Sequence, residues 1–301
     1  MKSKEITIIG ATGKLGIPVS LYLSQAGFKV TVVARDINKA EKFFRQAGNI
    51  SIVKGDLKDI ESLKSTLKNT EYLYLNLSTN TIDVNVPFAE EREGVANVLK
   101  AVSKDVIQQI IMISGLGAFQ KNIVPQQYTF PPNFIRSQGH ELLKKSGIPY
   151  TILHCSWFID SFIAFQRNGV YSVIGSNNNL IYFTNAYDYS RHLANAIGNN
   201  VAYNKEYPVQ GKEGFIHSEA AKIFLGIYSP KVKVKELPDG IINIIALFNK
   251  EMKLVKAMSS YFKHSKEVFQ AVESGTYKDL GEPKLSLKEY AEKLKSESYT
   301  I

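Results

Sequence analysis

Apolar and polar residues alternate along the first half of the chain with two different periods. Short runs rich in β-branched residues occur at 6–9, 29–33, 50–53, 72–77, 110–114 and 150–154. Between them, apolar residues recur at steps of three and four over 15–25, 38–46, 60–67, 90–102 and 133–145. The short runs are typical of buried strands and the longer period is typical of helices. Their alternation predicts a parallel sheet with crossover helices packed on it.

The pattern changes after residue 154 to aromatic and polar segments. It predicts helices at 187–197, from residue 218, over 240–270 and over 286–295, and strands at 207–210 and 232–235. Ser286 is placed to cap the last helix. We therefore expect an α/β protein with a Rossmann-type doubly wound parallel sheet in residues 1–154. Residues 155–301 are expected to form a smaller α/β C-terminal lobe, from which the chain can return to the sheet.

Composition narrows the classes of protein that fit this pattern. The 301 residues give room for about two domains, and 44% hydrophobic with 22% charged residues is ordinary globular usage. The net charge is +9, but basic residues are scattered among acids, so we expect no direct nucleic-acid binding. A single cysteine and a first strand starting near residue 5 predict a cytoplasmic protein. The most apolar later run, 241–248, is too short for a membrane span.

A glycine-rich turn carries the strongest chemical signal. It joins the first predicted strand directly to the first predicted helix, and it consists of Gly10, Ala11, Thr12, Gly13, Lys14, Leu15 and Gly16. Glycines allow a tight turn and a close approach of the backbone, so amides at the helix start can hold a pyrophosphate. A Walker loop is excluded, because Gly13-Lys14 follows Gly10 too closely and Leu15 replaces its Ser or Thr. The turn therefore predicts dinucleotide binding.

Residues after the second and third strands bear on the choice of cofactor. Arg35 ends the second strand, where a dinucleotide fold reads the adenosine ribose, and arginine there favours the 2′-phosphate of NADP(H). NAD(H) stays possible, because the neighbouring Asp36 could accept a 2′-hydroxyl; it could equally cap the next helix. Asp56 and Leu57 follow the third strand and could lie beside the adenine, and Asp56 could also be a cap or turn carboxylate.

The chain resembles the atypical short-chain dehydrogenases of the NmrA-like group, with isoflavone-reductase-like and quinone-oxidoreductase-like relatives. The resemblance covers nearly the whole sequence. The segments that carry it are 10–16 (GATGKLG), 33–36 (VARD), 55–57 (GDL), 94–99 (GVANVL), 111–115 (IMISG), 140–151 (HELLKKSGIPYT) and 281–290 (GEPKLSLKEY). It implies an NAD(P)-binding Rossmann domain and a small lobe that closes over the nicotinamide.

The resemblance also implies which loops line the cofactor cleft. These loops follow the fourth, fifth and sixth strands, where open α/β sheets bind their ligands. The residues concerned are Asn76, Leu77, Ser78, Ser114, Gly115, Ser156, Trp157 and Phe158. An aromatic set of Trp157, Phe158, Phe162 and Phe165 either walls a cavity for a flat or apolar substrate or packs the lobe.

The acid/base pair of catalytic relatives is absent. Such enzymes carry Tyr-x-x-x-Lys, which protonates a carbonyl oxygen, and here these two positions hold Asn133 and Ser137. Arg136 is expected to point about 100° away from the lysine position on the helix. His154, at the end of the sixth strand, and Tyr128, in a Pro- and Gln-rich loop, are the alternative proton donors. The five histidines and one cysteine show no metal-ligand spacing, so we expect no metal.

Two functions fit these observations. In the first, the protein transfers hydride from NADPH to a small carbonyl or quinone-like substrate. In the second, it binds NADP(H) without turnover and signals the redox state to a protein partner, which the missing Tyr/Lys pair favours.

Overall fold

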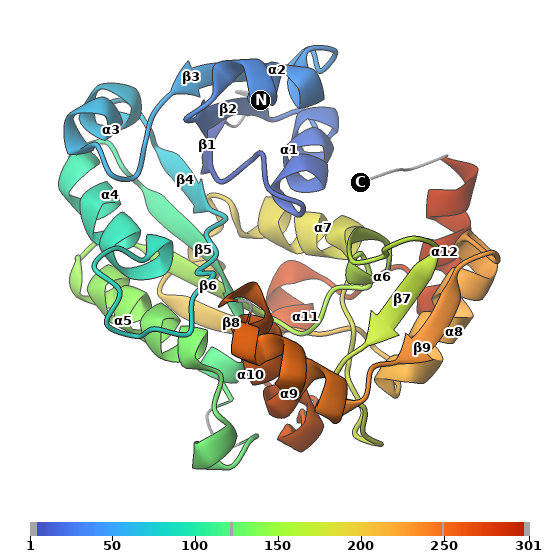
Figure 1. Ribbon diagram of the computed structural model, residues 1–301. Coiled ribbons are helices and arrows are strands. Elements are labelled where there is room, and N and C mark those ends of the chain that lie inside the picture. Colours follow the sequence, from blue (N-terminus) through green and yellow to red (C-terminus); the bar gives the residue numbers. More distant parts are fainter. Residues whose placement is uncertain (1–4, 121–122, 249, 298–301) are drawn as a thin grey trace.

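The computed structural model describes residues 5–120, 123–248 and 250–297, and one parallel sheet organises it (Figure 1). Its strands are β1 (Glu5–Ile9), β2 (Lys29–Ala34), β3 (Ile50–Lys54), β4 (Tyr72–Leu75), β5 (Gln109–Gly115), β6 (Tyr150–Cys155) and β8 (Lys205–Val209). The order is β3-β2-β1-β4-β5-β6-β8, and each pair is parallel. The order reverses between β1 and β4, so ligands are expected beyond the carboxyl ends there. The predicted doubly wound sheet is confirmed.

Helices cover both faces of the sheet. On one face lie α1 (Gly16–Gln25), α2 (Ile37–Phe44) and α7 (Ala186–Ala196), and on the other lie α3 (Ile60–Leu67), α4 (Val95–Ala101) and α5 (Pro131–Lys145). The first core contains Ile8, Leu23 and Leu193, and the second contains Leu73 and Val98. Each such burial contributes roughly 1.5–3 kcal/mol, so the alternating pattern dictates the layers.

The second lobe has its own small core beside the sheet. It contains α6 (Ser161–Ala164), the parallel pair β7 (Val170–Val173) and β9 (Lys233–Glu236), α8 (His217–Tyr228) and α12 (Leu287–Ser296). Phe162, Phe224 and Tyr290 are buried among these elements. Ser286 caps α12 as predicted, in a capping box with Glu289. The chain returns through α7 and β8 to the sheet between the parts of this lobe, so residues 155–301 are not one continuous unit.

The single long helix expected over 240–270 is wrong. The structure has α9 (Asp239–Phe248), α10 (Lys250–His264), a segment without helix over 265–270, and then α11 (Thr276–Leu280). The Lys266 amide donates to the Ile123 carbonyl (2.7 Å), and the Gln120 side chain donates to the Val268 carbonyl (2.6 Å). These tertiary hydrogen bonds outweigh helical propensity, which is a weak preference. The short elements α6, β7 and α11 were not predicted either.

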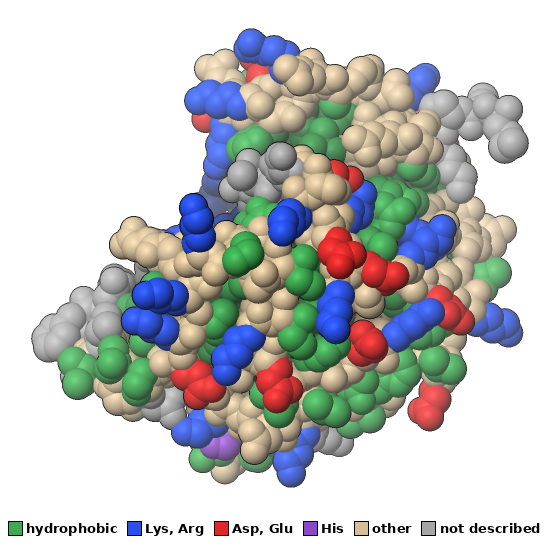
Figure 2. Space-filling view, turned by 90° about the vertical axis from the view of Figure 1, so that its right-hand side faces the viewer, with side chains coloured by type: hydrophobic (Ala, Val, Ile, Leu, Met, Phe, Trp, Pro, Cys, Tyr) green, Lys and Arg blue, Asp and Glu red, His purple; other side chains and the backbone are tan. Residues whose placement is uncertain are grey.

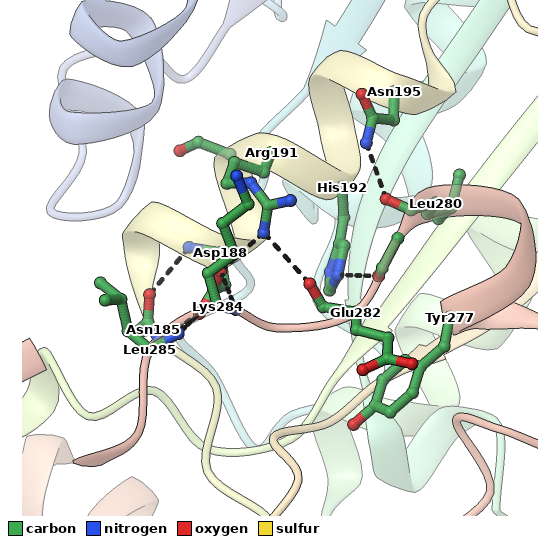
Figure 3. Close-up of polar contacts among 12 residues, drawn as sticks. Asn185, Asp188, Arg191, His192, Asn195, Tyr277, Leu280, Glu282, Lys284 and Leu285 are labelled. Atoms are coloured by element: carbon green, nitrogen blue, oxygen red, sulfur yellow. Dashed lines mark hydrogen bonds and ion pairs between the residues drawn. The ribbon is translucent and has the colours of Figure 1, made fainter. Parts of the chain in front are cut away.

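A buried aspartate on α7 fastens the C-terminal segment (Figure 3). Asp188 accepts hydrogen bonds from the backbone amides of Lys284 (2.8 Å) and Leu285 (3.1 Å). Arg191 pairs with the same carboxylate at 3.0 Å. Asn195 donates to the Leu280 carbonyl (2.8 Å). These contacts explain the role of the 281–290 segment, because they hold the chain that leads into α12 against α7.

The surface mixes charges of both signs. Figure 2 shows a face on which Lys and Arg side chains lie between Asp and Glu side chains, as their scattered order in the sequence predicts. Within the described part of the chain, the search for a helix of the length and hydropathy required to cross a membrane finds none.

Candidate functional site

The glycine turn is held tightly against the end of β4. The Asn76 amide donates to the Ile9 carbonyl (2.9 Å) and its side chain donates to the Gly10 carbonyl (3.1 Å). Gly10 has φ +89°, and a Cβ there would lie 2.1 Å from the Asn76 carbonyl oxygen. A Cβ on Gly16 would lie 2.3 Å from the Gly10 carbonyl oxygen, whereas one on Gly13 would come no closer than 3.3 Å. The outer two glycines therefore serve the fold, and Gly13 leaves the approach to the turn open.

The start of α1 meets the requirements for an anion site. Leu15 occupies its N-cap position and makes no side-chain capping hydrogen bond. Helix N-terminal amides without caps, at the positive end of the helix dipole, attract phosphate. Lys14 adds a positive charge beside them, and its Nζ donates to the Ala164 carbonyl (3.1 Å) and lies 4.2 Å from the centre of the Phe165 ring. Burial, then the charge of Arg167, lower the pKa of Lys14. This lysine links the turn to the second lobe.

The described part of the structure shows which residues after β2 and β3 have local hydrogen-bond partners and which have none. Asp36 caps α2, because its carboxylate accepts the Lys39 amide (2.9 Å). Arg35 beside it is exposed, and among the described residues it has no hydrogen-bond or ion-pair partner. Asp56 accepts the Lys58 amide (3.0 Å), which makes it a turn carboxylate, and Leu57 packs beneath Gly94. Of these groups, Arg35 is the one whose charge is left for a ligand.

A cavity of about 590 Å³ opens beyond the carboxyl ends of β4, β5 and β6, between the sheet and α10. Ten predicted cofactor residues line it: Lys14, Leu15, Asn76, Leu77, Ser78, Ser114, Gly115, Ser156, Trp157 and Phe158. The predicted residues outside its lining are Gly10, Thr12, Gly13, Gly16, Arg35, Asp56, Leu57, Tyr128 and His154. The lining is mostly apolar and aromatic, as in pockets that bind small organic molecules. The aromatic set divides, because Phe165 lines the cavity and Phe162 belongs to the lobe core.

His154 is in the wrong place for the expected proton donor. It is buried on the face of the sheet toward α5, and its Nε2 lies 2.9 Å from a Glu206 carboxylate oxygen. Lys144 pairs with the other oxygen of Glu206 (2.5 Å). Burial opposes ionisation of Glu206, but the hydrogen bonds of His154 and Lys144 lower its pKa to about 2. The neighbouring residue Cys155 points the other way and lines the cavity, because side chains alternate along a strand.

His140 joins the same cluster, which sequence spacing did not indicate. Ligand atoms of His140, His154 and Glu206 lie within 4.8 Å of one another, close enough to be compared with a metal site. The Lys144 ammonium already pairs with the Glu206 carboxylate, and its positive charge disfavours the binding of a metal cation there. The cluster is therefore best described as a buried structural network. Tyr128 is not among the lining residues of the cavity either: its ring stacks on His264, with ring centres 3.5 Å apart.

Glu91 and Arg136 form a charged pair in the cavity wall that sequence reasoning missed. Glu91 lies in a π-helical turn, Glu90–Gly94, and it is 1% exposed. Its carboxylate accepts the Thr79 amide (2.8 Å) and Arg136 Nε (2.8 Å). Arg136 also lines the cavity, and Gly139 lets α5 pack directly on the π-helical turn. π-Helical turns are frequent at functional sites, and the mid-helix glycine was the available signal.

The far wall of the cavity comes from α10 and the segment after it. Leu254, Val255, Met258, Tyr261, Phe262, Ser265 and Glu267 line it. Glu267 accepts hydrogen bonds from Ser156 Oγ (2.8 Å) and from Gln210 Nε2 (2.6 Å). Burial raises the pKa of Glu267 to about 7 in spite of these bonds. No motif in the sequence marked these residues as a cavity wall, since the whole segment was expected to form one helix.

The chain belongs to a family of NAD(P)H-binding proteins, whose model matches residues 10–181. It is 23% identical over 265 residues to quinone oxidoreductase 2 of Escherichia coli, covering 80% of this chain and 85% of that protein. It is 22% identical over 251 residues to the photosystem II assembly factor Ycf39 of a Synechocystis species, covering 81% and 74%. An uncharacterized chloroplastic protein of Arabidopsis thaliana is 26% identical over 164 residues, which are 51% of this chain and 59% of that protein.

Solved structures share the fold over the whole length. The NADPH-dependent quinone oxidoreductase of Escherichia coli in complex with NADPH has a TM-score of 0.68 at 21% identity and covers 96% of this chain and 99% of its own. The triphenylmethane reductase of a Citrobacter species with NADP(H) has a TM-score of 0.70 at 17% identity, covering 97% and 99%. The chain is thus a member of the NAD(P)H-binding family with the Rossmann fold of these structures, in agreement with its resemblance to the atypical short-chain dehydrogenases.

Proposed function

We propose that the protein is an NADPH-dependent reductase of a small carbonyl or quinone-like substrate. The observation that carries this proposal is the position of the largely apolar, aromatic cavity, which begins at Lys14 and Leu15 of the glycine turn. A dinucleotide held by that turn would reach into the same space in which an acceptor can bind.

The residues fit the cofactor. Amides at the start of α1 have no side-chain caps, and Arg35 is available for a 2′-phosphate. Ser114 Oγ is buried at the cavity without a hydrogen-bond partner in the described structure, and a bound cofactor or substrate would supply one. The cofactor supplies hydride when bound. The protein binds and orients the reactants and excludes water through the apolar wall.

Steady-state oxidation of NADPH against a panel of quinones and aldehydes tests this function. We expect turnover with at least one quinone, a larger rate with NADPH than with NADH, and no turnover after Gly13→Val. Absence of NADPH oxidation with every quinone and aldehyde would contradict the proposal.

A second candidate is a protein that binds NADP(H) without turnover and acts through a protein partner. The similarity to an assembly factor and the replacement of the Tyr/Lys pair by Asn133 and Ser137 favour it. Tight NADPH binding, measured by calorimetry, together with no oxidation of the cofactor, would support this alternative over the reductase.

A further inference from the structure

Two polar side chains meet at the cavity from opposite lobes. A Cβ placed on Gly117 would lie 2.3 Å from the Tyr261 hydroxyl and 2.5 Å from Asn133 Nδ2. The hydroxyl comes from α10 and the amide comes from α5, and both residues line the cavity. Because Gly117 has no side chain, both groups pack on its backbone next to the end of β5 and converge there in the cavity lining.

The amide of Asn133 is oriented so that its Nδ2 lies beside the Tyr261 hydroxyl. Arg136 Nη1 donates to Asn133 Oδ1 (2.9 Å), and Glu91 holds the guanidinium by its Nε (2.8 Å). This leaves Nδ2 on the side of Gly117. In the described residues, neither Nδ2 of Asn133 nor the hydroxyl of Tyr261 has a hydrogen-bond acceptor. Two convergent donors in an apolar cavity are an arrangement that stabilises negative charge on an oxygen atom.

The hydroxyl of Tyr261 is kept in its protonated form. Burial and then the nearby carboxylate of Glu267 raise the pKa of Tyr261, and the charge of Arg136 opposes them to a smaller extent. A phenol in this state is a donor at neutral pH. The backbone next to Tyr261 is held by side chains outside α10. Asn179 Nδ2 donates to the Ser265 carbonyl (2.7 Å), and Asn177 Nδ2 donates to the Phe262 carbonyl.

We propose that Tyr261 and Asn133 together bind the oxygen of the carbonyl or quinone substrate, and that Tyr261 gives this oxygen its proton. This rests on the proposed reductase function. When the carbonyl carbon receives a hydride from NADPH, the C=O π electrons move to oxygen. The O–H bond of Tyr261 breaks as its proton joins that oxygen, and solvent returns a proton to the phenolate. With an aldehyde the products are NADP⁺ and the alcohol. With a quinone, the carbon that received the hydride then loses a proton to solvent as the second oxygen gains one, which gives NADP⁺ and the hydroquinone.

The first arm of the test measures binding without cofactor. Calorimetry compares 9-fluorenone with fluorene, which has the same flat rings and no carbonyl oxygen. One hydrogen bond changes affinity about 2- to 10-fold. Tyr261→Phe should therefore weaken the binding of fluorenone by that factor and leave the affinity for fluorene unchanged. Tyr128→Phe removes a hydroxyl outside the cavity and should change neither. Equal changes for both ligands, or no change for fluorenone, would overturn the contact.

The second arm separates proton transfer from hydride transfer. A triarylmethane cation takes up hydride without needing a proton, whereas a quinone or aldehyde needs one. Tyr261→Phe should slow the reduction of the quinone or aldehyde by about 100-fold and change reduction of the cation by less than about twofold. Equal slowing of both acceptors would overturn proton donation. If the native protein binds fluorenone through Tyr261 but none of the acceptors supports oxidation of NADPH, the reductase function is overturned and the contact stands.

Discussion

The two walls of the cavity are built in different ways. The wall on the sheet side consists of strand ends and the turns after them, such as Asn76, Ser114 and Cys155, and ladder hydrogen bonds to neighbouring strands fix the backbone. The wall on the lobe side consists of α10 and residues 265–270, and side chains distant in sequence hold it, among them Gln120 and Asn179. The backbone of the sheet-side wall is thus fixed by the strand ladder, and the lobe-side wall depends on side-chain contacts between distant segments.

This difference suggests a division of roles. A wall fixed by parallel strands can hold a cofactor shared by many related proteins. A wall fastened by a few side-chain hydrogen bonds can change its shape, and with it the substrate, without altering the sheet. Substitutions on the two sides should therefore separate cofactor affinity from acceptor affinity.

The largest effect is expected at the glycine turn. Gly13→Val should weaken NADPH binding by about 100-fold or more, because a branched side chain displaces at least two charge-assisted amide contacts. The nearest atom to a Cβ here is 3.3 Å away, so the fold should persist. Calorimetry for binding and far-UV circular dichroism for folding check this. Gly16→Ala is the contrasting variant, since its Cβ would lie 2.3 Å from a carbonyl oxygen and should lower stability instead. Normal NADPH affinity in Gly13→Val would show that the turn serves only the fold.

A smaller effect on the same wall should follow the loss of Arg35. Arg35→Ala should weaken NADPH binding by about 10- to 100-fold and leave NADH binding unchanged, because a charge-assisted contact to the 2′-phosphate contributes roughly 1.5–3 kcal/mol. Dissociation constants of both cofactors measure this. Equal constants for NADPH and NADH in the native protein would reject the assignment.

On the lobe side, Glu267 predicts a dependence of stability on pH. Burial raises its pKa to about 7 from the ordinary value of 4.5, so the folded state holds the proton more tightly than the unfolded state. Stability from this group is present below about pH 4.5 and is lost as the pH rises to about 7. The free energy of unfolding of Glu267→Gln should therefore exceed that of the native protein by on the order of 1–2 kcal/mol at pH 8, and by little at pH 4. Denaturant unfolding at both pH values checks the sign; a gain that is the same at both would contradict it.

The smallest effect is expected from loosening α10. Asn179→Ala removes the hydrogen bond to the Ser265 carbonyl and should raise the KM of the acceptor by about 2- to 5-fold with NADPH affinity unchanged. Asn199→Ala is a matched control, because it removes a similar bond to the Asn195 carbonyl at the end of α7. A parallel change in cofactor affinity would mean that the two walls are not independent.

The sequence by itself determined the layers, the topology class and the cofactor turn. Each depends on neighbours in the chain: β-branched runs for β1 to β6, helical periods for the crossovers, and Gly10 to Gly16 between a strand and a helix. Ser286 and Asp36 also act as caps, as their positions before helices allow. These local patterns predict the fold well, because each one already sets the apolar face of a strand or helix that the sheet then buries.

Only the tertiary structure decided the chemistry opposite the cofactor. The position of His154 at a strand end did not reveal that its side chain faces α5 and Glu206. The helical angle of Arg136 gave no hint that Gly139 admits the π-helical turn that carries Glu91. The helix expected over 240–270 ends at His264 because Gln120 bonds the chain at Val268, 148 residues away in sequence. These choices depend on contacts between segments that no local period encodes, and a few such hydrogen bonds outweigh the small differences in helix propensity.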